Sequence, residues 1–170
     1  MDEKQVILNS YLKKVICLMK DNNLVLPEKA VINIYHHKGV NNLAEIGAMF
    51  MNIVNKEYCK SYVVLLKGQK YPEHFHRIKE ESFYVLCGKL KVNVENEVFD
   101  LKPGQIFHIE CGQNHSFWAD DDVIFEELST QYVPNDSVYT DDLIRNATYD
   151  QRRTTINQEK WKEIRKQWMR

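Results

Sequence analysis

Three histidines and one glutamate are spaced in a way that could build a metal site. His74 and His76 lie two positions apart, Glu81 follows shortly after them, and His115 comes later in the chain. On a β-strand the side chains of residues i and i+2 point to the same face, so His74 and His76 can both point into one site. Imidazoles and a carboxylate together suit a divalent transition metal such as Mn, Fe, Co, Ni or Zn. The spacing therefore predicts a metal centre.

The sequence around these residues predicts antiparallel β structure. Short segments rich in β-branched and aromatic residues follow one another at 31–35, 50–54, 62–66, 82–87, 90–94, 97–101, 105–109, 115–119 and 123–128. Turn residues such as Gly68, Gly88 and Pro103-Gly104 separate them. This spacing is typical of an antiparallel sandwich or barrel rather than of alternating strands and helices. Neighbouring strands can then bring Glu81 and His115 to the paired histidines.

Helices are expected at both ends of the chain. Residues 3–20 place apolar side chains on one stripe, namely Leu8, Leu12, Val15 and Met19. Residues 157–169 return to helical spacing, with Asn157 as the N-cap and with Trp161, Ile164 and Trp168 on one face. No linker divides the chain. We therefore expect a single domain over 1–170, with an N-terminal helix at 1–24, a β-barrel at 30–135 and a C-terminal helix at 156–170.

Composition narrows the classes of partner. The net charge of -1 gives no long-range attraction for nucleic acid or for an anionic membrane. No run of about 18 apolar residues could span a bilayer, and the first residues do not resemble a secretory signal, so a cytoplasmic location is expected. None of the four cysteines, Cys17, Cys59, Cys87 and Cys111, forms a C-x-x-C pair. Reduced thiols without a disulfide are predicted.

The histidine and glutamate residues resemble the motifs of the cupin family. The first motif, G-x5-H-x-H-x4-E-x6-G, is matched at every position by Gly68, His74, His76, Glu81 and Gly88. The resemblance covers about residues 60–130. It implies an all-β fold, the cupin double-stranded β-helix (jelly-roll) barrel. It also implies a metal held inside that barrel by His74, His76, Glu81 and His115.

The second cupin motif, G-x5-P-x-G-x2-H-x3-N, is matched in part. Gly112 and His115 fit it, whereas Glu110 and Ala119 stand where the family has proline and asparagine. These departures affect turn residues and not a metal ligand.

A narrower similarity concerns Lys79, which stands two residues before Glu81. The chain looks like the cupin-type D-lyxose isomerases, in which a lysine at this spacing and a glutamate on a late strand work beside the metal. Glu127, within residues 125–129, resembles that glutamate. Side chains alternate along a strand, so Glu127 points inward if Phe125 does, and a shift of one residue would exchange it for Glu126. The resemblance implies Glu127 as the base and Lys79 as the acid or electrostatic partner.

The expected activity is that of a metal-dependent sugar isomerase of the D-lyxose/mannose type. Four protein ligands leave two positions on a six-coordinate ion, which suit the α-hydroxy carbonyl end of an open-chain aldose. The metal, with manganese favoured over Zn, Fe, Co or Ni, would polarise the carbonyl and stabilise an enediolate. Neither a glycine-rich phosphate loop nor a group of arginines lies near the motif, which favours an uncharged sugar.

Two other functions stay open at this point. The same ligands could serve a cupin dioxygenase, which needs no acid–base pair, or the chain could be a non-catalytic sugar-binding module. Residues 33–140 also look like the C-terminal cupin domain of sialic-acid-synthase-like proteins, which implies sugar metabolism near surface-glycan assembly. The resemblance to the cupin family, together with the terminal helices, implies a homodimer. The spacing does not distinguish an isomerase from an epimerase.

Overall fold

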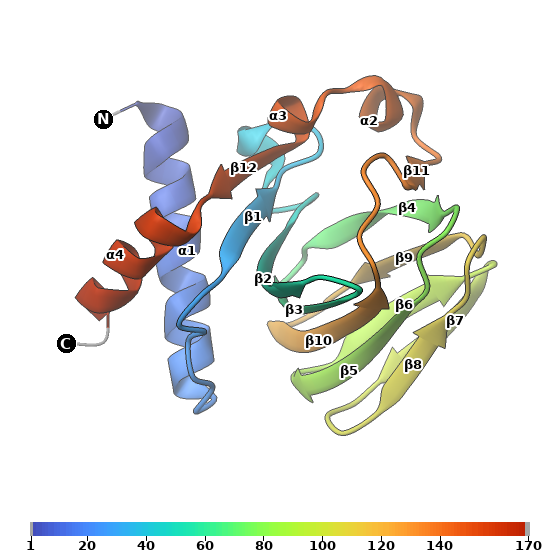
Figure 1. Cartoon of the computed structure of the whole chain (residues 1–170), viewed down its shortest axis with the longest axis horizontal. Coiled ribbons are helices and arrows are strands. Elements are labelled where there is room, and N and C mark those ends of the chain that lie inside the picture. The colour runs from blue at the N-terminus through green and yellow to red at the C-terminus, as the bar shows by residue number, and fades with distance from the viewer. Residues whose placement is uncertain (1, 169–170) are drawn as a thin grey trace.

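Two antiparallel β-sheets face each other in the computed structural model, which describes residues 2–168 (Figure 1). The seven-stranded sheet has the order β12 (Arg153–Ile156), β1 (Val31–Tyr35), β2 (Ala48–Asn55), β3 (Tyr58–Leu65), β10 (Val123–Thr130), β5 (Glu81–Cys87) and β8 (Ile106–Ile109). The five-stranded sheet has the order β11 (Ser137–Tyr139), β4 (Lys70–His76), β9 (His115–Trp118), β6 (Leu90–Val94) and β7 (Glu97–Leu101). The strands thus form two separate sheets, a sandwich, where we expected a barrel.

Aromatic rings fill the space between the two sheets. Phe83, Phe117 and Phe125 come from β5, β9 and β10, and each is at most 1% exposed. The ring centroids of Phe83 and Phe125 are 4.9 Å apart, and those of Phe83 and Phe117 are 5.2 Å apart. Offset and edge-on contacts at such distances stabilise a core beyond the area they bury. This layer fixes the two sheets around the site.

Helices α1 (Glu3–Asp21) and α4 (Gln158–Trp168) lie together beside β1 and β12 (Figure 1). They form a second hydrophobic core with residues of β1, β2, β3 and β10, separate from the layer between the sheets. Trp161 is fully buried there, and its indole Nε1 donates to the backbone oxygen of Pro27 at 2.9 Å. The predicted apolar stripe of α1 is buried in the same core, so that prediction is confirmed.

The predicted helix ends are close to those observed. The side chain of Asn157 accepts a hydrogen bond from the backbone nitrogen of Lys160 at 3.0 Å, which confirms the predicted cap. α1 ends before residue 24 because Asn22 closes the helix and Asn23 takes the left-handed conformation, with φ of 57°. Residue 1 and residues 169–170, which the predicted helices include, lie outside the described residues.

The segment after residue 135 contains elements that the sequence pattern did not predict. These are β11, α2 (Asp142–Asn146), α3 (Tyr149–Arg152) and β12; a short 3-10 helix, η1 (Val40–Asn42), is also new. The limit of 135 for the β region is therefore wrong. Each of these elements is too short to show a helical or strand period, and β12 exists because it pairs with the edge of β1. Within the described residues the four cysteines are free, as predicted, and no helix is long and apolar enough to cross a membrane.

Two glycines with similar backbone angles give a matched test of this packing. Gly88 and Gly104 have φ of 78° and 87°. A Cβ on Gly88 would press against the backbone oxygen of Asp122 and lie 2.9 Å from Val123 Cα, whereas a Cβ on Gly104 meets nothing within 4 Å. We expect Gly104→Ala to lower the free energy of unfolding by about 1 kcal/mol through backbone strain alone. Gly88→Ala should cost about 3 kcal/mol or more, because β10 must also move. Urea denaturation measures both, and equal losses would contradict the packing described for Gly88.

Candidate metal centre

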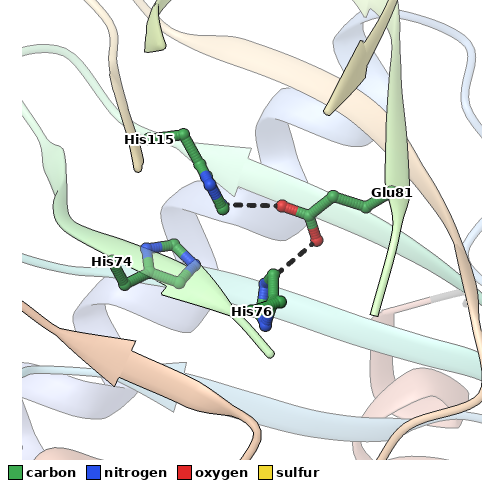
Figure 2. A group of neighbouring side chains, drawn as sticks. All are labelled: His74, His76, Glu81 and His115. Atoms are coloured by element: carbon green, nitrogen blue, oxygen red, sulfur yellow. Dashed lines mark ion pairs between the residues drawn. The ribbon is translucent and has the colours of Figure 1, made fainter. Parts of the chain in front are cut away.

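The four predicted ligands come together inside the sandwich (Figure 2). His74 and His76 lie on β4, Glu81 begins β5, and His115 begins β9. One potential ligand atom from each lies within 4.8 Å of the others. His74 and His115 are direct partners in the pairing of β4 with β9, which fixes their rings side by side. Each of the four residues is at most 4% exposed.

The donor atoms of this cluster fit a cation. Nε2 of His76, Nε2 of His115 and Oε1 of Glu81 are buried and form no hydrogen bond. The Nδ1 atoms of His74 and His115 lie 2.9 Å from the backbone oxygens of Pro72 and Gln113. A carbonyl oxygen only accepts, so each Nδ1 carries the proton, and the Nε2 lone pairs stay free. Buried polar atoms without a partner are costly, and a divalent metal would satisfy them.

The protonation states also suit metal binding. Burial and the neighbouring imidazoles lower the pKa of His74 well below its usual value, so the ring is neutral. Burial would raise the pKa of Glu81, but the neighbouring Lys79 ammonium holds this pKa well below its usual value. A neutral imidazole and an ionised carboxylate are the forms that bind a metal. The cluster is compatible with a divalent ion.

Lys79 joins two buried carboxylates at the edge of the cluster. Its Nζ lies 2.5 Å from Glu81 Oε2 and 3.0 Å from Glu127 Oε1. Burial alone would lower the pKa of Lys79, but the charges of Glu127 and Glu81 raise it, so the amine is an ammonium. Desolvating charged groups is expensive unless each has a close partner, and here each carboxylate has one. The structure thus places both predicted acid–base residues beside the predicted ligands.

Strand parity decides between the two neighbouring glutamates. Glu127 and Phe125 share the inner face of β10, and Phe125 is fully buried between the sheets. Glu126 lies on the opposite face, where its carboxylate pairs with Lys60 Nζ at 2.9 Å. Burial raises the pKa of Glu127, although the charge of Lys79 opposes this rise. Of the two, Glu127 is the one that reaches the cluster.

A cavity of about 600 Å³ opens beside the cluster and is lined by Lys79, Glu127 and all of the predicted ligands except His115. Its far wall is polar. Ser61 Oγ donates to Asn52 Oδ1 at 3.0 Å, and Thr155 Oγ1 donates to Asn33 Oδ1 at 2.8 Å. Hydroxyl and amide groups of this kind can exchange hydrogen bonds with a polyhydroxy compound.

Comparison with known proteins agrees with this arrangement. Residues 61–130 match the family model named Cupin domain. A D-lyxose/D-mannose isomerase of Thermosediminibacter oceani is 27% identical over 157 residues, which cover 75% of this chain and 87% of that protein.

Two solved structures share the fold over most of the chain. One is a mutant L-ribose isomerase of Acinetobacter sp. DL28 in complex with L-ribose, with a TM-score of 0.68, 13% identity, and coverage of 86% of this chain and 95% of that one. The other is the ligand-free L-ribose isomerase of Cellulomonas parahominis, with a TM-score of 0.66, 13% identity, and coverage of 83% and 94%. The similarity in fold therefore extends well beyond the cupin domain itself.

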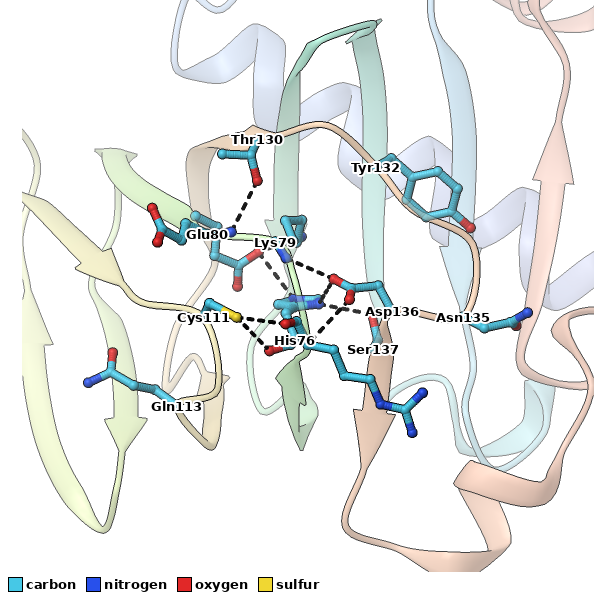
Figure 3. A network of polar contacts seen from close by, with 12 residues as sticks. His76, Lys79, Glu80, Cys111, Gln113, Thr130, Tyr132, Asn135, Asp136 and Ser137 are labelled. Carbon is cyan, nitrogen blue, oxygen red and sulfur yellow. Dashed lines mark hydrogen bonds and ion pairs between the residues drawn. The ribbon is translucent and has the colours of Figure 1, made fainter.

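Two residues outside the predicted set also contact the cluster (Figure 3). Asp136 Oδ2 lies 3.5 Å from His76 Nδ1, and Ser137 Oγ lies 3.3 Å from the same atom. The Asp136 carboxylate also accepts from the backbone nitrogens of Arg77 and Lys79, each at 3.0 Å. Such contacts orient a ligating imidazole. Sequence reasoning missed them because only the pairing of β11 with β4 brings residues 136–137 to the cupin domain's first motif.

Replacing one imidazole tests the metal centre. We expect His76→Ala to lower the affinity for Mn²⁺ or Zn²⁺ by about 100-fold or more, because a ligand and its contact with Asp136 are both lost. Metal content after dialysis, measured by mass spectrometry, gives the result. His108→Ala is the control, because His108 is exposed and contacts Ser82 Oγ at 3.0 Å, away from the cluster. Unchanged occupancy in folded His76→Ala protein would contradict the ligand set.

Proposed function

We propose that this chain is a metal-dependent aldose–ketose isomerase of the D-lyxose/D-mannose type. The observation that carries the proposal is the contact of Lys79 with Glu127 at 3.0 Å, beside four metal-binding side chains and inside one cavity. The isomerase activity for which the Thermosediminibacter relative is named supports the same reaction. The fold alone does not, because one scaffold hosts unrelated chemistries.

His74, His76, Glu81 and His115 would hold the divalent metal, with manganese favoured. When bound, such an ion supplies a positive charge that polarises a sugar carbonyl and makes the neighbouring C–H bond more acidic. Burial of the four ligands keeps water from competing for the site, since none is more than 4% exposed. The substrate's C1–C2 end then lies next to Glu127 and Lys79.

The chain's own residues would move the protons. The Glu127 carboxylate takes the proton from C2 of the aldose, and an enediolate forms as the C2–H electron pair becomes a C1–C2 double bond. The same carboxylic acid returns the proton to C1, while the hydroxyl proton of O2 ends on O1. C1 is thereby reduced and C2 oxidised, and no external oxidant is needed. Burial raises the pKa of Glu127 toward neutrality, which suits a base that must also give its proton back.

Lys79 has the complementary task. Its ammonium stabilises the negative charge that develops on the sugar oxygen as Glu127 takes the proton. It also keeps Glu81 ionised. A dioxygenase or a non-catalytic sugar-binding module needs no such acid–base pair, so the pair favours the isomerase over both alternatives. A role near surface-glycan assembly and a homodimer rest on resemblance alone and stay predictions.

Proton exchange in deuterated water tests the mechanism. With Zn²⁺-loaded protein and a panel of aldoses and ketoses, we expect deuterium at C1 or C2 of one pair. Glu127→Gln and Lys79→Ala should slow this exchange by about 100- to 10,000-fold, because each removes a proton-transfer or charge-stabilising group. Glu126→Gln is the matched control, since it changes the neighbouring side chain on the outer face. Proton NMR measures the exchange.

Exchange that survives both substitutions would remove Glu127 and Lys79 from these roles. Metal content of each variant is measured in parallel, so that loss of metal is not mistaken for loss of a base. Turnover that stops under anaerobic conditions would replace the isomerase with an oxygenase.

A further inference from the structure

Arginines that are distant in sequence gather beside the cavity of the candidate metal centre. A smaller cavity of about 190 Å³ is lined by Arg77, Arg145 and Arg152, and Arg153 lines the larger one. The two cavities share part of their lining, including Tyr35, Tyr132 and Asp136. This group is not visible in the sequence, because more than sixty residues separate Arg77 from the other three arginines. An uncharged sugar was predicted from the lack of such a group, and that prediction loses its basis.

The charge of three of these arginines is not neutralised by the protein. Arg145 pairs with Asp142, but within the described residues no carboxylate lies within 4.0 Å of the guanidinium groups of Arg77, Arg152 or Arg153. The one carboxylate that lines both cavities, Asp136, accepts hydrogen bonds from backbone nitrogens and faces His76. The positive charge beside the cavities is therefore available to a bound anion.

Arg152 and Arg153 both pack on the ring of Tyr149. Their guanidinium carbons lie 5.0 Å and 4.5 Å from the centre of the Tyr149 ring. Nε of Arg152 is buried and has no hydrogen-bond partner. Arg153 donates from Nη1 to the Tyr35 hydroxyl at 3.4 Å, which leaves its other donors free. A guanidinium group with unused donors can bind a carboxylate or phosphate group through paired N–H···O bonds.

The arginine pair lies one aromatic ring away from the candidate metal centre. The guanidinium of Arg152 is 5.1 Å from the centre of the Tyr139 ring. On its other side the Tyr139 ring stacks on His74, with centroids 5.3 Å apart. Arg153 lines the same cavity as Lys79 and Glu127. One ligand can therefore contact the candidate metal centre at one end and this arginine at the other.

We propose that the larger cavity takes a sugar with an anionic group at the end remote from C1, and that Arg153 binds this group. Arg152, which lines the adjoining smaller cavity, adds its positive charge. The proposal rests on the proposed isomerase function for the orientation of the sugar. It concerns a carboxylate or a phosphate, which the guanidinium groups recognise by the same chemistry. These arginines then select a charged sugar over a neutral one.

Binding measurements test the proposal without relying on turnover. Calorimetry with Zn²⁺-loaded protein compares D-mannose, D-mannose 6-phosphate and D-mannuronate. At least one anionic sugar should bind about tenfold or more tightly than mannose. Arg153→Gln should lose most of this advantage and Arg152→Gln a smaller part, whereas Arg153→Lys, which keeps the charge and the stem, should retain part of it. Lys89→Gln is the control, because it removes one positive charge from an exposed residue that lines neither cavity.

The results separate this proposal from the isomerase itself. Tighter binding of the phosphate sugar alone, or of the sugar acid alone, supports the site and identifies the anion. Equal affinity for all three sugars, or an advantage that persists in both glutamine variants, overturns it. If no proton exchange is found but an anionic sugar binds through the arginines, the anion site stands and the isomerase does not. If mannose exchanges and charge gives no advantage, the isomerase stands and the anion site does not.

Discussion

The buried charges of Glu81, Lys79 and Glu127 are the constraint on which this site depends. Taking an ion out of water costs several kcal/mol unless close partners replace the lost hydration. Here one ammonium lies within 3.0 Å of two carboxylates, and one of these carboxylates faces the histidine cluster. A small displacement of any strand would leave a charge without a partner. The interior of the sandwich must therefore hold these groups rigidly, and it must leave an open cavity next to them.

Rigidity comes from two apolar layers, one between the sheets beside the cavity and one beneath the helices. The phenylalanine layer between the sheets fixes β5, β9 and β10, the strands that carry Glu81, His115 and Glu127. The helices α1 and α4 cover the other face of the seven-stranded sheet. The strands β1, β2 and β3 are thereby free to present Asn33, Asn52 and Ser61 to the cavity. The helices thus stabilise one face of this sheet, and the cavity lies on the other face.

The segment from residue 131 to residue 156 adds side chains of its own around the candidate metal centre. It lies outside the matched cupin domain, yet it supplies Asp136, Tyr139, Arg152 and Arg153 to the surroundings of the cluster. β11 extends one sheet beside β4, and β12 extends the other beside β1, so both ends of the segment are fixed by backbone pairing. Because the candidate metal-binding residues lie within the matched region, the choice of substrate is expected to lie in this segment.

Local patterns in the sequence determined a large part of the molecule. Side-chain alternation predicted most strands, helical spacing predicted α1 and α4, and the spacing of His74 and His76 predicted that they share a face. The same alternation gave Glu127 an inward direction once Phe125 was taken as core. These features depend on residues a few positions apart, which one sequence displays. Only the tertiary structure decided the contact of Lys79 with Glu127, the approach of Asp136 to His76, and the place of Arg77 and Arg152 around one cavity. These arrangements join residues far apart in the chain. They exist because β5 pairs with β10, β11 with β4 and β12 with β1, and no local period records such pairings.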